Sequence, residues 1–148
     1  MTPGCRPALA QATWKVHRKG LDRLILVAPA ISASYDIERL AAAHVNDFVI
    51  NFASERDMQV GLGTRLFGTI DRKYEYAAGY HGFDARFEDL VQWRWSAIDR
   101  SFGHRGNHVA YLGRRWQLGF LLPAIDPDLT QADVARIWEA RREVASDE

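Results

Sequence analysis

Two short apolar runs, separated by a segment of about helix length, constrain the fold more than any other feature of the sequence. The runs are Leu24–Ala28 and Phe48–Phe52, and short continuous apolar runs are typical of parallel strands that helices cover on both faces. Between them, Asp36 can cap a helix with a stripe that includes Ile37 and Leu40. A strand–helix–strand unit joins parallel strands, so both runs are predicted to end at the same edge of the sheet.

Periodicity predicts further elements on both sides of this unit. One further stretch is predicted to hold a short helix, and three glycines interrupt it: Gly61, Gly63 and Gly68. The other predicted elements are a first helix over Ala8–Lys19, an edge strand over Val91–Ala97, a helix over Val109–Phe120 bounded by Pro123, and a C-terminal helix opened by a Thr130–Asp133 capping box. In the edge strand, Trp93 and Trp95 share the face that is predicted to be buried in the core.

Length and composition indicate a single domain. The chain has 148 residues, of which 47% are hydrophobic and 11% aromatic, and this is enough apolar surface for one core. We therefore expect one α/β domain over residues 1–148. Its predicted architecture has three layers, in which a short, mostly parallel sheet of about three main strands is flanked by helices.

Charge and cysteine content exclude several function classes. Nineteen basic residues balance 19 acidic ones, so neither nucleic acid nor an anionic membrane is an expected partner. No apolar run approaches the roughly 18–20 residues of a membrane span. Cys5 is the only cysteine and no signal peptide precedes it, so a cytoplasmic location is expected. No motif predicts a cofactor or a metal ion.

Polar groups follow two of the predicted strands, in the loops where ligand sites of parallel sheets lie. Asp57 follows the second apolar run, and His104 and His108 follow the edge strand. A buried carboxylate beside an imidazole fixes the tautomer of the ring and stabilises its protonated form. Two interpretations remain open, because Asp57 can equally cap a helix that starts near Met58 while the histidines are exposed loop residues.

Three segments resemble the C-terminal half of an α/β-hydrolase: Leu24–Ser32 (LILVAPAIS), Val49–Asp57 (VINFASERD) and Ala77–Phe83 (AAGYHGF). The resemblance spans roughly Ala8 to Ile125 and is closest to esterase- and lipase-like serine hydrolases. These enzymes carry their triad in the chain order Ser, acid, His. The resemblance implies that Asp57 is the acid and that His108, which Tyr111 and a helix follow closely, is the base. His104, deeper in the glycine-containing loop, is the alternative base.

The sequence departs from this family at the nucleophile, because no G-x-S-x-G motif is present and the strand that should precede it is missing. By the resemblance, the helix Ala8–Lys19 would follow the nucleophile, which places the missing serine at or before Met1. Cys5 is a poor substitute because no strand precedes it. Ser32 and Ser34 are expected to cap a helix, since the corresponding loop of the family does not carry the nucleophile.

Two functions follow as expectations. The first is a truncated serine hydrolase for small-molecule carboxylic esters, inactive or incomplete alone. The alternative is a non-catalytic interaction module that pairs through the exposed edge strand Leu24–Ala28, either with a second copy or with the missing N-terminal half. A zinc site made by His104 and His108 is disfavoured, because Gly103 and Gly106 interrupt any helix that would bring both imidazoles to one face.

Overall fold

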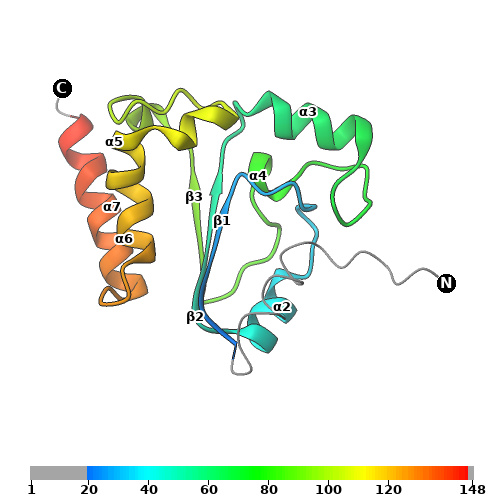
Figure 1. Ribbon diagram of the computed structural model, residues 1–148, viewed down its shortest axis with the longest axis horizontal. Helices are drawn as coiled ribbons and strands as arrows, with labels where there is room; N and C mark the ends of the chain where they lie inside the picture. The colour runs from blue at the N-terminus through cyan, green and yellow to red at the C-terminus, as the bar shows by residue number, and fades with distance from the viewer. Residues whose placement is uncertain (1–19, 147–148) are drawn as a thin grey trace.

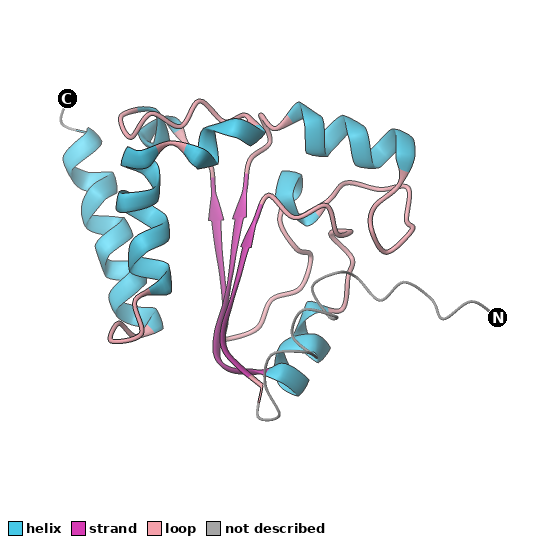
Figure 2. Ribbon diagram, viewed as in Figure 1, coloured by secondary structure: helices cyan, strands magenta, loops and turns pink. Residues whose placement is uncertain are grey.

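A computed structural model of the chain describes residues 20–146, and its centre is a three-stranded parallel sheet (Figures 1 and 2). The strands are β1 (Leu21–Val27), β2 (Val45–Ala53) and β3 (Leu90–Arg94), in the spatial order β1-β2-β3. This confirms a mixed α/β fold built on a short parallel sheet. Cys5 and the expected first helix lie outside the described residues.

Helices make up most of the remaining described chain. They are α2 (Ile37–His44), α3 (Met58–Phe67), α4 (Ala78–His81), the 3₁₀ helices η1 (Ala97–Arg100) and η2 (His108–Leu112), α5 (Arg114–Trp116), the π-helical turn η3 (Gln117–Leu121), α6 (Leu122–Ile125) and α7 (Gln131–Ser146). The predicted caps are present. Asp36 accepts a hydrogen bond from the Arg39 N–H at the start of α2, and Thr130 and Asp133 form reciprocal hydrogen bonds at the start of α7.

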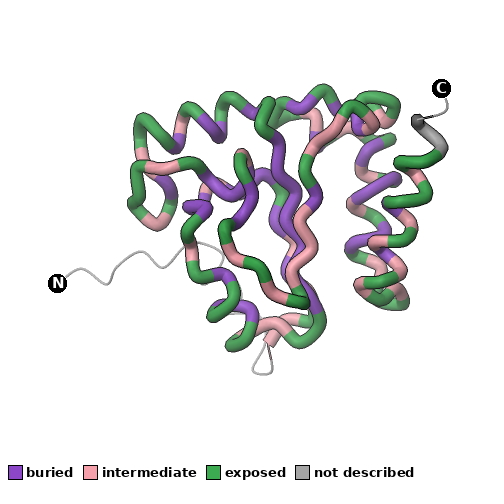
Figure 3. Tube along the Cα trace, turned by 180° about the vertical axis from the view of Figure 1, so that it is seen from behind, coloured by how far each residue is buried: buried purple, intermediate pink, exposed green. Residues whose placement is uncertain are grey.

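The sheet lies between two groups of helices. On one face, Phe52 and Ile50 of β2 pack in a core with Trp116 and Trp138, which belong to α5 and α7. On the other face, β1 and Val49 of β2 pack in a second core with α2. Figure 3 shows buried residues concentrated along the strands, whereas buried and exposed residues alternate along the helices. No helix among residues 20–146 is long and apolar enough to cross a membrane.

The expected strand Val91–Ala97 is shorter than predicted. It ends at Arg94, because the Ser96 N–H donates a hydrogen bond to Asp99 Oδ2 at 2.8 Å and starts the 3₁₀ turn η1. Trp93 is buried as expected, but Trp95 is only half-buried and Ala97 is exposed. The prediction that Trp95 shares the buried face of a strand was therefore wrong.

The expected helix Val109–Phe120 was also wrong at both ends. Its first part is the 3₁₀ helix η2, which ends before Gly113, and it leaves Val109 61% exposed. The second part runs from α5 through η3 into α6, so that Pro123 lies inside a helical segment rather than beyond it. Proline has no N–H to donate, and the π-helical turn directly before it changes the hydrogen-bond register there.

A close backbone contact fixes the loops at the carboxyl end of the sheet. Gly79 of α4 lies against the end of β1, where an added Cβ would approach the Ala28 carbonyl carbon to 2.3 Å. Its N–H donates to the Pro29 carbonyl at 2.9 Å, and its carbonyl accepts from the Ser54 N–H at 2.9 Å. Because α4 is bonded to the ends of both strands, Gly79 positions the loop that leads to Asp57.

Candidate functional site

Asp57 and His108 meet at the carboxyl end of the sheet. Asp57 follows β2 and His108 begins η2, beyond β3, and Asp57 Oδ2 lies 2.9 Å from His108 Nδ1. An ionised carboxylate only accepts hydrogen bonds, so Nδ1 is the donor. The Asp57 side chain is fully buried, whereas that of His108 is 49% exposed. With Nδ1 bound to the carboxylate, Nε2 is the nitrogen that remains for a second partner.

The same carboxylate caps α3. Asp57 Oδ1 accepts a hydrogen bond from the Val60 N–H at 3.2 Å, and α3 starts directly after Asp57, at Met58. Asp57 therefore makes both predicted contacts, one with each oxygen. The expectation that both histidines are exposed loop residues is wrong for His104, which is buried. The helix cap fixes the position of the carboxylate that contacts His108.

The two loops of the site are bonded to each other through buried groups. The Ser54 hydroxyl donates to the Gly106 carbonyl at 2.6 Å. Gly106 has a φ of 92°, and an added Cβ would meet the Arg56 Cβ at 2.7 Å, so a residue with a side chain does not fit there. These contacts hold the loop that carries His108 against the loop that carries Asp57.

His104 makes different contacts and is fully buried. Its Nδ1 accepts a hydrogen bond from the Gly106 N–H at 3.0 Å, so Nε2 carries the proton of the neutral ring, and Nε2 has no hydrogen-bond partner. Its ring centroid lies 4.2 Å from that of Tyr111. Burial lowers the pKa of His104 below the ordinary histidine value, although the Asp99 carboxylate opposes this shift. The structure thus brings His108, and not His104, into contact with Asp57.

The buried Asp99 residue supports the loop that contains His104. The sequence did not predict Asp99 as a residue of the site. This carboxylate is 1% exposed. Its Oδ1 accepts hydrogen bonds from the indole N–H groups of Trp93 at 3.2 Å and Trp116 at 3.1 Å, and its backbone carbonyl accepts from the His104 N–H at 2.8 Å. The Ser96–Asp99 spacing of a capping box was the available signal for a structural role.

Ser32 and Ser34 do not cap a helix, and that expectation was wrong. The Ser32 hydroxyl donates to Asp71 at 2.5 Å and the Ser34 hydroxyl to Glu75 at 2.6 Å, while Asp36 caps α2. Burial raises the pKa of Asp71, but the hydrogen bonds from Ser32, from the Thr69 side chain and from the Asp71 backbone together lower it below the ordinary aspartate value. Both serines therefore tie the loop after β1 to the loop after α3.

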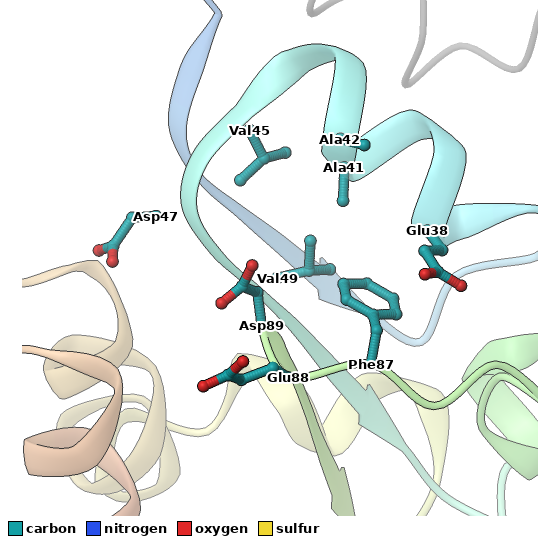
Figure 4. A pocket seen from close by; sticks show the side chains of 9 residues that line it. All are labelled: Glu38, Ala41, Ala42, Val45, Asp47, Val49, Phe87, Glu88 and Asp89. Atoms are coloured by element: carbon teal, nitrogen blue, oxygen red, sulfur yellow. The ribbon is translucent and has the colours of Figure 1, made fainter.

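A hollow of about 280 Å³ lies at the opposite end of the sheet, between α2, the start of β2 and the segment before β3 (Figure 4). Its floor is apolar, with Val49 and Phe87, and four carboxylates surround it. One of them, Asp47, pairs with Arg23 at 2.8 Å. Because Asp57 and His108 lie at the carboxyl ends of the strands, this hollow is not part of their site.

Among residues 20–146, no group of three histidine, cysteine, aspartate or glutamate side chains is placed to hold a metal ion. Comparisons of the chain with protein-family models, with curated proteins and with solved structures found no match. The geometry of Asp57, His108 and their surroundings is therefore what indicates a function for this chain.

Proposed function

We propose that the chain provides the acid and the histidine of a serine hydrolase that acts on carboxylic esters, and that its nucleophile comes from outside residues 20–146. The observation that carries the proposal is the 2.9 Å contact between the buried Asp57 carboxylate and the half-exposed His108 imidazole. The resemblance of the surrounding segments to α/β-hydrolases adds support, because the order acid then histidine is the order of that family.

The geometry suits general base catalysis. Asp57 holds His108 in the tautomer with the proton on Nδ1 and stabilises the imidazolium that forms when the ring is protonated. The other nitrogen, Nε2, would accept the proton of an attacking serine hydroxyl and then donate it to the leaving alcohol. Proton transfer therefore requires a serine hydroxyl within hydrogen-bond reach of Nε2.

The serines near the site have other hydrogen-bond partners. Ser54 is buried and donates to Gly106, and Ser96 is bound to Asp99. By contrast, β1 forms an edge of the described sheet. A parallel strand paired to β1 would end at the same rim as Asp57, at a lateral distance of about 10 Å from β2 for two strand spacings of about 4.8 Å. The proposal places the serine on such a strand.

The first experiment measures the tautomer of His108 in the isolated chain. Two-bond ¹⁵N–¹H correlation spectra should show the His108 proton on Nδ1. The Asp57→Asn variant should shift this proton to Nε2, because the side-chain amide of the introduced asparagine can donate to Nδ1. An unchanged tautomer in Asp57→Asn would contradict the role of Asp57.

The second experiment tests hydrolysis. The isolated chain should not react with a fluorophosphonate probe, whereas an extended chain to which a strand and a G-x-S-x-G segment have been added before β1 should be labelled and should turn over p-nitrophenyl esters. His108→Ala should abolish turnover, and Asp57→Asn should reduce kcat by about 10⁴-fold. Turnover that is equal in the extended chain and its His108→Ala variant would refute the proposal.

The position of β1 favours a second candidate function, a non-catalytic module that pairs through this edge. Such a module would dimerise, so its apparent mass in solution would increase with protein concentration. Val27 of β1 is 38% exposed, and Val27→Lys would weaken the dimer. Size-exclusion chromatography with mass detection distinguishes this function, because it requires self-association without reaction at His108.

A further inference from the structure

Three arginines surround a hollow of about 550 Å³ beside the candidate site. Arg56 comes from the loop after β2, and Arg100 and Arg105 come from the segment after β3; Gly103 completes the lining. All three arginines are exposed. Residues far apart in the sequence therefore place three positive charges around one opening.

Two of these guanidinium groups are held on a common aromatic ring. The Arg56 Cζ atom lies 4.6 Å from the centroid of the Trp95 ring, and the Arg100 Cζ atom lies 5.5 Å from it. Trp95 is itself fixed, because its indole N–H donates to the His104 carbonyl at 2.9 Å. The stem of Arg56 also packs on Gly106. Stacking on an anchored indole restricts both arginines and reduces the entropy that they lose when a ligand binds.

These arginines have no acidic partner within the described residues. No carboxylate of residues 20–146 lies within 4.0 Å of a nitrogen of Arg56, Arg100 or Arg105. The acids next to these arginines in the sequence have other partners. Glu55 lies 3.7 Å from His81, Asp57 contacts His108 and the Val60 N–H, and Asp99 accepts from the indoles of Trp93 and Trp116. Like charges gathered without a direct ion pair repel one another, and an anion in the hollow would reduce this repulsion.

We propose that this hollow binds the phosphate group of a small phosphorylated molecule. Three guanidinium charges match a phosphate monoester, which carries about −1.5 to −2 charges at pH 7, better than a singly charged carboxylate. The planar donor fork of arginine also fits phosphate oxygens in pairs. The inference does not rest on hydrolysis by Asp57 and His108, because no contact of that pair enters the argument.

The experiment titrates the full chain with inorganic phosphate at pH 7 and uses sodium chloride of equal ionic strength as the reference. The Trp95 indole N–H and the amides of Gly103 and Arg105 should shift in ¹H–¹⁵N spectra with phosphate and not with chloride. Arg100→Gln and Arg105→Gln should each weaken phosphate binding about tenfold, as loss of a charge-assisted hydrogen bond does. Arg86→Gln, which removes an exposed arginine elsewhere, should leave the affinity unchanged.

Three results would overturn the proposal: no phosphate-specific shift, an equal loss of affinity in Arg86→Gln, or binding to phosphatidic acid vesicles without binding to inorganic phosphate. The last result would assign the hollow to a lipid headgroup at a membrane surface. The His108 tautomer, measured in the same samples, reports separately on the hydrolase proposal and should be unchanged in the Arg100 and Arg105 variants.

Discussion

Asp57 contacts His108 with one carboxylate oxygen and binds the first turn of α3 with the other. Oδ2 lies 2.9 Å from His108 Nδ1, and Oδ1 lies 3.2 Å from the Val60 nitrogen. One buried carboxylate therefore caps a helix and contacts an imidazole at the same time. The contributions of the helix cap and of the His108 contact to stability can be separated by choosing which residue replaces Asp57.

Asp57→Asn should cost less stability than Asp57→Ala. Asparagine keeps an oxygen that can cap α3, and it ranks with aspartate at this position. Alanine removes the cap and leaves the His108 contact unmade, so its free energy of unfolding should be lower than that of Asp57→Asn by about 1–2 kcal/mol. Urea denaturation of both variants measures the difference, and equal stabilities would show that the cap contributes nothing.

The free energy of unfolding should decrease as the pH is lowered, because His104 is buried. Burial lowers the pKa of this histidine in the folded chain, while the unfolded chain takes up the proton near pH 6.5, at about the ordinary histidine pKa. The unfolded state therefore binds more protons as the pH falls below about 6.5, and folding becomes less favourable until the folded-state pKa is passed. Urea midpoints measured between pH 5 and 8 should vary less in His104→Gln. Parallel pH profiles for both proteins would refute this origin.

Two glycines should respond oppositely to alanine. Gly79→Ala should destabilise the chain by at least about 3 kcal/mol, because the new Cβ would overlap the backbone of Ala28 and Pro29. Gly63 lies in α3 with nothing within 4 Å of an added Cβ, so Gly63→Ala should stabilise by about 0.5–1 kcal/mol through helix propensity. Thermal unfolding of the two variants tests the contrast. A mild effect at Gly79 would mean that α4 can move away from β1.

Asp99→Ala should be among the more damaging substitutions outside the candidate site. It leaves two buried indole N–H groups, those of Trp93 and Trp116, without their acceptor, and each such group costs about 1–3 kcal/mol. Near-ultraviolet circular dichroism and urea denaturation should both report the loss. Asp133→Ala, at a partly exposed capping carboxylate that accepts from Thr130, is the comparison and should cost much less stability.

Apolar runs and capping residues in the sequence predicted the strands and helices that these short-range features determine. The apolar runs became β1 and β2, and the caps of α2 and α7 formed where Asp36 and Thr130 indicated. The meeting of Asp57 and His108 was also accessible, since loops that follow neighbouring parallel strands share a rim. Sequence position gave only weak grounds for choosing between His108 and His104. The Gly106 N–H donates to His104 Nδ1, and this hydrogen bond depends on the conformation of the folded loop.

Other errors arose where hydrophobic periodicity did not reveal a turn, a change of helix type or a long-range contact. Trp95 continues an alternating pattern, but the Ser96–Asp99 turn ends the strand before it. Pro123 normally marks a helix end, but here a π-helical turn precedes it and the helix continues. The bonds from Ser32 and Ser34 to Asp71 and Glu75 join residues about 40 positions apart, a separation that helical and strand periodicity do not detect.

Arg23 of β1 joins the beginning of the described chain to its end. Its guanidinium pairs with Asp47 at 2.8 Å and donates to the carbonyls of Asp126 and Leu129, in the turn between α6 and α7. Two carbonyls of this turn therefore accept hydrogen bonds from a strand more than 100 positions earlier. Such a distant closure has a high entropic cost, so the C-terminal helical pair should dock late in folding, after the first strand has joined the sheet.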